Sequence, residues 1–238
     1  MAKLFVRTTL LTLLTCFTAL VSKAQIGYDY AQYDLGVSVG YNQFYGDVLT
    51  SKSTTGYSLN FNYNQTAFIN YIFEFQAGKL AGGDITNDPF GRKFSADYQY
   101  YAFRLQLQAG EFIDYSDSPF ANAMKNLYVG TGIGIIFDNI QANNINRYSQ
   151  QYPGYYTPGL NKSQETFLPV RLGYEFKIFN QYQRPDVKID VGYQYNFVFG
   201  DELDGFKAGH LNDGYSQFSI GVKFAIGGIT SNSKQINY

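Results

Sequence analysis

The chain contains one histidine, the most direct place to look for acid–base chemistry. His210 lies close in sequence to Asp204 and Asp213. Ser216 follows a few residues later, so the segment holds the residue types of a serine hydrolase. Their spacing does not single them out as a catalytic set, and a solvated loop histidine is the simpler interpretation. We therefore predict no catalytic residues and no enzyme activity.

Acidic residues of the same segment have the chemistry of a calcium site, because Ca²⁺ prefers several oxygen ligands. The candidates are Asp201, Glu202, Asp204 and Asp213. Their spacing departs from that of an EF-hand loop, and acidic loop residues are common. The sequence also contains no phosphate-binding loop, no dinucleotide-binding glycine motif and no Cys/His cluster. We expect neither a metal nor a cofactor.

A second set of charged residues falls on the polar side of segments in which polar and apolar residues alternate. The set comprises Glu74, Arg104, Arg171, Glu175, Lys177, Lys188, Asp190 and Lys223. In a closed barrel these residues share the interior, where the low dielectric of the lipid walls favours ion pairs. Two interpretations stay open: a polar plug that fixes register and stability, or a narrow, weakly anion-preferring pore.

The elements that position these residues are strands, since period-two alternation recurs along the chain. The alternating segments are 35–42, 57–64, 71–78, 101–108, 129–137, 170–177, 188–197 and 217–224. One face is aliphatic and aromatic, and the other is rich in Gly, Ser, Asn and Gln, which is typical of a transmembrane barrel. The predicted fold is all-β: an eight-stranded antiparallel up-and-down transmembrane β-barrel, whose closure leaves no strand edge unpaired in lipid. A soluble barrel or sandwich is the alternative, but it would carry more Lys and Glu.

Composition agrees with this prediction. Only 16% of the 238 residues are charged, against roughly 25% in soluble domains, while 18% are aromatic. A formal charge of −1 argues against a nucleic-acid-binding surface. The mean hydropathy of −0.24 indicates that apolar residues are dispersed, unlike those of a polytopic helical membrane protein.

The first residues have the pattern of an export signal. Lys3 and Arg7 precede an apolar stretch, 8–21, and Ala24 ends a small-residue cleavage site. We predict a cleaved signal peptide at 1–24 and a single barrel domain at 25–238. Cleavage removes the only cysteine, Cys16, and leaves 15 basic against 19 acidic residues, a net charge of −4.

The predicted connections alternate in length. Those between strands two and three and between strands six and seven are short, whereas the predicted loops after strands one, three, five and seven span 47–55, 81–93, 138–164 and 201–213. Short turns are periplasmic in such barrels, so both chain ends are predicted to be periplasmic. Aromatic residues near strand ends are candidates for the membrane-interface girdles: Tyr41, Tyr45, Tyr63, Tyr128, Phe137 and Phe199.

Two connections are candidates for contacts with partners. The periplasmic connection 111–126 is unexpectedly long, and Ser118 and Pro119 predict the start of a short helix there; its candidate contacts are Ser118, Phe120 and Met124. A simple insertion explains this length equally well.

The longest outer loop is rich in Asn, Gln and Tyr, which is the composition of adaptable recognition surfaces. A loop that only covers the barrel mouth is the alternative interpretation. Its candidate contacts are Tyr148, Tyr152, Tyr155 and Tyr156.

Several segments resemble the small outer-membrane barrels of Bacteroidota. They include 34–40 with Tyr45-Gly46-Asp47, the strand 172–176, and 201–205 with the closing strand 212–224. The resemblance implies an integral outer-membrane barrel surrounded by lipid, OmpA-type but without a peptidoglycan-binding domain. Some members of this group belong to type IX secretion and gliding machinery and contact periplasmic proteins. The expected function is thus a structural or accessory subunit of an envelope complex, with an adhesin or ligand-binding barrel, or a small pore, as alternatives.

Overall fold

Eight antiparallel strands account for most of the chain in this computed structural model, which describes residues 27–116, 118–182, 184–208 and 212–233. The strands are β1 (Gly27–Tyr45), β2 (Ser51–Asn64), β3 (Ile69–Gly83), β4 (Lys93–Gln108), β5 (Leu127–Asn146), β6 (Lys162–Phe179), β7 (Pro185–Val198) and β8 (Gly214–Ser233). Each contains one predicted alternating segment, so the predicted strands and fold class are confirmed. The predicted signal peptide, Cys16 and His210 lie outside the described residues.

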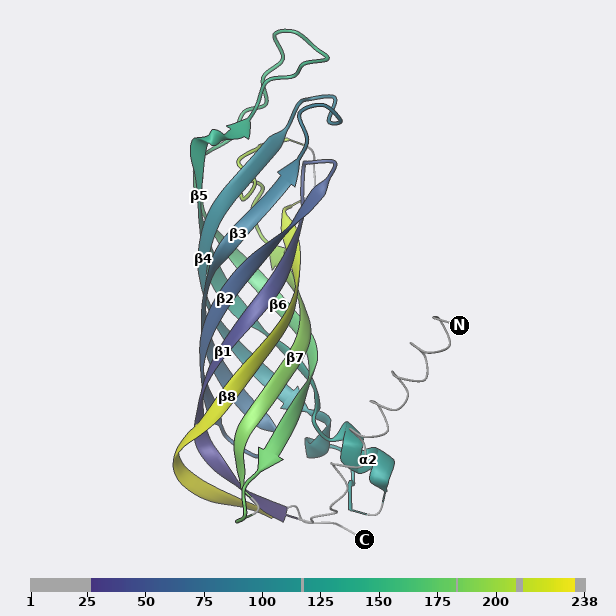
Figure 1. Cartoon of the computed structure of the whole chain (residues 1–238), viewed down its shortest axis with the longest axis vertical. Helices are drawn as coiled ribbons and strands as arrows, with labels where there is room; N and C mark the ends of the chain where they lie inside the picture. The colour runs from purple at the N-terminus through teal and green to yellow at the C-terminus, as the bar shows by residue number, and fades with distance from the viewer. Residues whose placement is uncertain (1–26, 117, 183, 209–211, 234–238) are drawn as a thin grey trace, which may run out of the picture.

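The strands form one closed ring in sequence order (Figure 1). β8 completes it by pairing with β1 from Gly27↔Ser233 to Tyr45↔Gly214. None of the helices in the described ranges is long and apolar enough to cross a membrane. The connections β1–β2, β3–β4, β5–β6 and β7–β8 gather at one end, here called the loop end. The opposite end carries the remaining turns.

The strands extend further toward the loop end than predicted. β3 continues to Gly83 and β5 to Asn146, so the predicted loops 81–93 and 138–164 are too long. The alternation of hydrophobicity stops where the apolar band stops, but backbone pairing does not depend on side-chain polarity. Ser, Thr and Asn residues therefore continue the ladder beyond the apolar segments.

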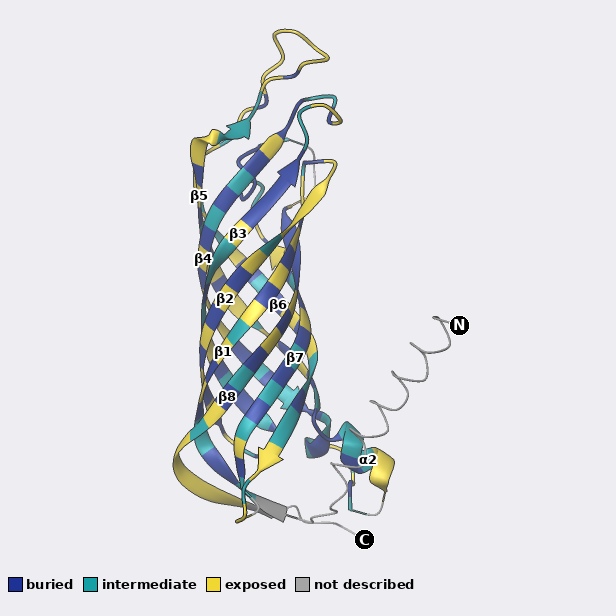
Figure 2. Cartoon of the chain, in the orientation of Figure 1, coloured by how far each residue is buried: buried dark blue, intermediate teal, exposed yellow. Residues whose placement is uncertain are grey.

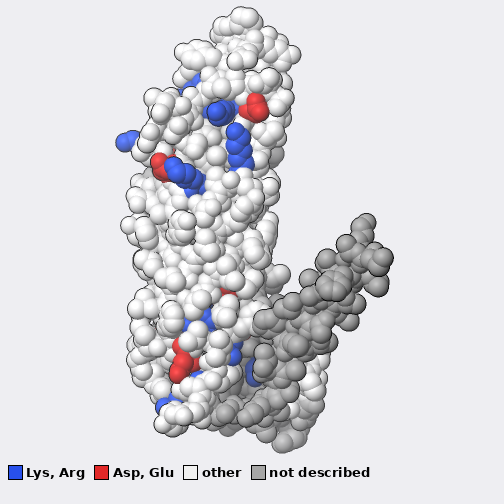
Figure 3. Space-filling model, viewed as in Figure 1, with Lys and Arg blue, Asp and Glu red and all other residues white. Residues whose placement is uncertain are grey.

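The outward face is an apolar band. Burial alternates along each strand in Figure 2, and the exposed positions include Val37, Leu59, Phe73 and Ile133. On the face drawn in Figure 3, charged side chains lie toward the two ends and leave an uncharged zone between them. The prediction for Tyr128 is wrong. Its side chain points inward and is buried, because Val129 occupies the outward position next to it.

The interior near the loop end is a hydrophobic core. Its large members include Phe44, Leu80, Phe94, Tyr98, Tyr100, Ile136, Phe167, Leu203, Phe206 and Tyr215. Glycine provides part of the space: a Cβ at Gly134 would lie 2.4 Å from the Phe167 ring. The Phe167 ring meets that of Tyr100 edge-on, with centroids 5.1 Å apart. Residues from strands and from the β7–β8 loop thus fill this half of the barrel.

Candidate functional site

Buried ion pairs occupy the rest of the interior. The Arg104 guanidinium (Nη2) lies 2.6 Å from Glu74 Oε2, and both side chains are almost fully buried. Arg171 Nη2 lies 2.5 Å from Asp190 Oδ1. Lys223 Nζ extends the second pair, lying 3.0 Å from Asp190 Oδ2 and 2.8 Å from Glu175 Oε1. The first pair therefore links β3 with β4, and the second group links β6, β7 and β8.

The network continues toward the turn end. Lys188 Nζ lies 2.6 Å from Asp34 Oδ2, and both side chains are buried. Lys177 Nζ donates to Gln108 Oε1 at 2.8 Å and to the Ala67 carbonyl at 2.9 Å. The structure therefore places all eight charged residues of the sequence-based set inside the barrel. Asp34 was missing from that set, although the parity of Gly36 and Ser38 also places it inward.

Tyrosine hydroxyls are further members that the sequence reasoning missed. Tyr128 donates to Asp190 Oδ1 at 3.0 Å and accepts from Arg171 Nε at 2.7 Å. Tyr100 donates to Gln76 Oε1 at 2.8 Å and also contacts Glu74. Each hydroxyl satisfies a buried charged group that would otherwise carry a desolvation cost.

A small cavity lies within the ion-paired part of the interior. A cavity of about 10 Å³ lies among Ser38, Asn60, Glu74, Arg104 and Lys223. That volume holds roughly one water molecule. Packing of this kind matches an eight-stranded barrel whose side chains fill its interior.

The predicted recognition loop projects beyond the barrel (Figure 1). Tyr148 and Tyr156 form a short antiparallel bridge, with ring centroids 5.2 Å apart. Tyr152 and Tyr155 pack against Phe90 of the β3–β4 loop, at centroid distances of 6.0 and 5.1 Å. All four tyrosines stay exposed. The structure thus unites them in one aromatic surface to which a second loop contributes.

Two buried carboxyl groups of the β7–β8 loop lie close to each other. Asp204 Oδ1 accepts from the backbone N–H of Phe206, and Asp213 Oδ2 from that of Leu203, both at 2.9 Å. Burial raises the pKa of both carboxyls; repulsion from Asp47 adds to the effect at Asp204, and repulsion from Asp204 adds to it at Asp213. Within the described residues, no three His, Cys, Asp or Glu side chains are arranged to hold a metal ion. Ser216 is buried, where its hydroxyl lies 3.4 Å from that of Tyr45.

The raised pKa values of Asp204 and Asp213 predict that the stability of the folded barrel depends on pH. Asp213→Asn should weaken this dependence. The unfolded chain releases its protons near pH 4, whereas the folded loop retains them because its pKa values are raised. Stability therefore falls as pH rises from about 4 through neutrality. We expect the wild type to lose roughly 1–3 kcal/mol more than Asp213→Asn between about pH 4 and 8. Thermal unfolding, followed by the heat-dependent gel mobility of barrels, measures this difference. The exposed control Asp186→Asn should behave as wild type; equal pH slopes in all three proteins would contradict the prediction.

The connection between β4 and β5, residues 109–126, is called the α2 turn. It contains a 3-10 helix (Ala109–Glu111) and α2 (Pro119–Met124). Ser118 caps α2 by accepting from the backbone N–H of Ala121 at 3.3 Å, which confirms the predicted helix and its cap. Ser118 and Phe120 are exposed, whereas Met124 is half-buried. Phe112, which the sequence reasoning did not select, is also exposed.

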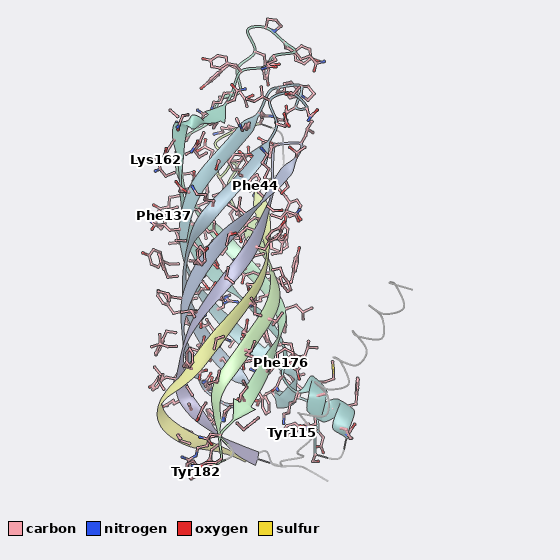
Figure 4. The ribbon with its side chains drawn as sticks, in the orientation of Figure 1. Phe44, Tyr115, Phe137, Lys162, Phe176 and Tyr182 are labelled. Carbon is pink, nitrogen blue, oxygen red and sulfur yellow. The ribbon has the colours of Figure 1, made fainter. Side chains whose placement is uncertain are left out.

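The α2 turn is attached firmly to the barrel. Tyr115 is buried against Phe68, with ring centroids 5.6 Å apart (Figure 4). Lys125 Nζ lies 4.8 Å from the centroid of the Tyr115 ring, and burial lowers the pKa of this lysine to about 8. The Tyr174 hydroxyl donates to the carbonyl of Ala123 at 2.6 Å. The turn therefore presents its exposed side chains in a fixed arrangement.

Comparison with known proteins shows the fold. No protein-family model and no curated protein matches the sequence. The solved structure of Neisserial surface protein A matches with a TM-score of 0.53 and 11% identity, over 84% of this chain and 99% of that one. Ail, the attachment invasion locus protein of Yersinia pestis, matches with a TM-score of 0.44 and 13% identity, over 82% and 98%. With the closed ring and the outward apolar band, the match to Neisserial surface protein A shows that the chain has the fold of an eight-stranded outer-membrane-type β-barrel.

Proposed function

We propose that this barrel is a non-enzymatic accessory subunit of an envelope complex and docks through its α2 turn. The observation that carries the proposal is the exposure of Phe120 and Phe112, at 75% and 73% the highest among the large apolar side chains of the described residues. Aromatic anchors of this kind dominate binding energy at protein interfaces. Because the turn is already ordered, docking requires little further loss of conformational entropy.

Connection lengths support a periplasmic position for the α2 turn. The turns β2–β3 and β6–β7 at its end are short, while the opposite end carries the longer β3–β4, β5–β6 and β7–β8 loops. Such barrels have short periplasmic turns and longer outer loops. β1 begins and β8 ends at the same end of the barrel as the α2 turn, so the proposed orientation puts the start of β1 and the end of β8 on the periplasmic side. The resemblance to Bacteroidota barrels suggests secretion or gliding machinery as the assembly.

The filled interior favours a scaffold over a pore. A hydrophobic core and an ion-paired layer follow one another along the barrel, and a cavity of about 10 Å³ lies among the charged residues. Function is then expected at the two ends of the barrel. The inner charges serve stability and register, and the end surfaces serve recognition.

Crosslinking and mild detergent extraction test the proposal with paired variants. Phe112→Ser/Phe120→Ser should reduce the yield of co-purified envelope proteins by roughly tenfold or more, since each anchor contributes about 1–2 kcal/mol or more to binding. Neither residue lies inside the barrel, so heat-dependent gel mobility should be unchanged. The matched control Tyr148→Ser/Tyr155→Ser changes two exposed aromatics at the other end and should retain the partners. Equal partner recovery with all three proteins would contradict docking through the α2 turn.

The aromatic surface of the outer loops supports a second candidate, a ligand-binding or adhesive barrel. Phe90 and the four tyrosines present rings together with hydroxyl groups on two neighbouring outer loops. The same two variants discriminate between the functions. Partners or surface ligands that are lost only with Tyr148→Ser/Tyr155→Ser would favour this candidate.

A further inference from the structure

The lipid-facing surface carries cations at the loop end of one side of the barrel. Lys79 of β3, Asp97 of β4, Asn139 of β5 and Lys162 of β6 are register partners in a single row. Lys79 shares the outward parity of Phe73 and Phe75, so the row faces away from the interior. All four residues are exposed or half-exposed.

Two more lysines extend this surface on the loop side of the row. Lys52 of β2 pairs with Ala81, which is one outward position beyond Lys79 on β3. Lys93 of β4 pairs with Gly83, which is two outward positions beyond Lys79. A register shift between Lys52 and Gly56 reverses the parity of β2, which turns Lys52 outward. Together, Lys52, Lys79, Lys93 and Lys162 form the lysine rim.

The lysine rim keeps a positive excess. Of its four members, only Lys79 forms an ion pair in the part of the chain that the structure describes: its Nζ lies 2.7 Å from Asp97 Oδ1. Asp84 of the β3–β4 loop lies within the electrostatic field of Lys52. With Asp97 and Asp84 counted, the surface carries four positive and two negative charges. This surface therefore attracts anions.

The rim lies where the apolar band ends. Phe137 is the last outward aromatic residue of β5 before Asn139, and Figure 4 shows Lys162 beyond Phe137 toward the loop end. Tyr57 and Tyr101 of the same side are exposed within the band. A ligand in contact with this surface meets cations at one level and a hydrophobic wall directly below. The outer ends of β7, β8 and β1 instead present uncharged residues outward, among them Phe197, Phe218 and Tyr45.

We propose that the lysine rim binds the phosphate groups of an anionic glycolipid of the outer leaflet, whose acyl chains cover the apolar band beneath. Lysine stems extend along apolar surface and place the ammonium at headgroup level, and each lysine near an anionic membrane surface strengthens binding. A soluble anion contacts only the lysines, whereas a lipid contacts both the lysines and the apolar band below them. Because the cations lie on one side, the barrel orders such lipids asymmetrically. The inference rests on the orientation proposed above, since the loop end must face outward.

Lipid retention by the purified full chain tests the inference. The probe is phosphorylated glycolipid extracted from outer membranes, incorporated with the barrel into mixed micelles and quantified as phosphorus per barrel after gel filtration. Lys52→Gln/Lys79→Gln/Lys93→Gln should reduce apparent affinity by roughly ten- to a hundredfold, given about 1 kcal/mol per lysine. Asp97→Asn should raise retention, because it releases Lys79 from its ion pair. Lys207→Gln, an exposed loop lysine outside the rim, should have no effect.

Two further arms identify the ligand. The same glycolipid after chemical removal of its phosphates should bind the wild type as weakly as the intact lipid binds the triple variant. Excess inorganic phosphate should not displace the lipid; complete displacement would indicate a simple anion site and overturn the proposal. Equal retention by wild type and triple variant, both with native heat-dependent mobility, would also overturn it. Micelles expose both ends of the barrel, so a wrong orientation leaves this result unchanged and is detected separately by labelling Tyr152→Cys on intact cells.

Discussion

Asp190→Ala is expected to lower the free energy of unfolding by about 3–5 kcal/mol, because it leaves the buried Arg171 guanidinium without its carboxylate. Asp190 accepts hydrogen bonds from Arg171, Lys223 and Tyr128. Among the described residues, Arg171 then keeps hydrogen bonds to two neutral groups, the hydroxyls of Tyr128 and Ser219. Equilibrium unfolding by guanidinium in lipid vesicles, followed by heat-dependent gel mobility, measures the loss.

The exposed ion pair between Lys79 and Asp97 provides the matched control. Both side chains are about half exposed, so Asp97→Ala should cost less than about 1 kcal/mol. Asp190→Asn keeps an acceptor for Tyr128 but removes the charge, and we expect an intermediate loss. If Asp190→Ala were no more destabilising than Asp97→Ala, the interior network would not contribute the stability assigned to it.

Phe206→Ala is expected to release the β7–β8 loop from the barrel mouth. Phe206 is fully buried and meets Phe94 edge-on, with ring centroids 6.3 Å apart. Removing a buried Phe side chain costs about 3–5 kcal/mol. The loss should favour local unfolding of the loop, which allows the backbone at Lys207, whose side chain is already exposed, to adopt the extended conformation that trypsin cleaves. Cleavage after Lys207 under native conditions should become roughly a hundredfold faster or more.

Phe112→Ala controls for the removal of an aromatic ring outside the barrel and should leave this cleavage unchanged. The ion-paired layer lies beneath the hydrophobic core and is not altered in Phe206→Ala. We therefore expect neither the wild type nor Phe206→Ala to show steady conductance in planar bilayers. Protection of Lys207 that does not change in Phe206→Ala would show that the loop is held by its backbone contacts alone, such as Lys207 N–H to the Pro158 carbonyl at 2.8 Å.

The alternation of residue types predicts the strands and the inward position of most buried charges. In β7, for example, Lys188, Asp190 and Gln194 share a parity opposite to that of Val191 and Tyr193. Pairing partners of the charges do not follow from parity, because they depend on strand register around the ring. Tyr128 shows a different limit: its residue type suggested a girdle position, but its parity is inward.

The hydrophobic core near the loop end was not predicted, because both parities of β4 carry aromatic residues there. Tyr98 and Tyr100 are inward, whereas Tyr101 and Phe103 are outward. Inward glycines on other strands, such as Gly134, make room for large rings, and this complementarity is visible only in three dimensions. The outward position of Lys52 was equally hidden, since the register shift before Gly56 breaks the alternation.

The seam between β1 and β8 has a consequence for how the protein is made. Among the described strands, these two pair over more positions than any other neighbouring pair, from Gly27↔Ser233 to Tyr45↔Gly214. The first strand to emerge from synthesis therefore waits for the last before its outer edge is paired. Lipid does not accept an unpaired edge, and contacts between distant parts of a chain form slowly. The edge of β1 therefore stays unpaired until β8 has been synthesised. Insertion into the membrane and closure of the ring must then occur together.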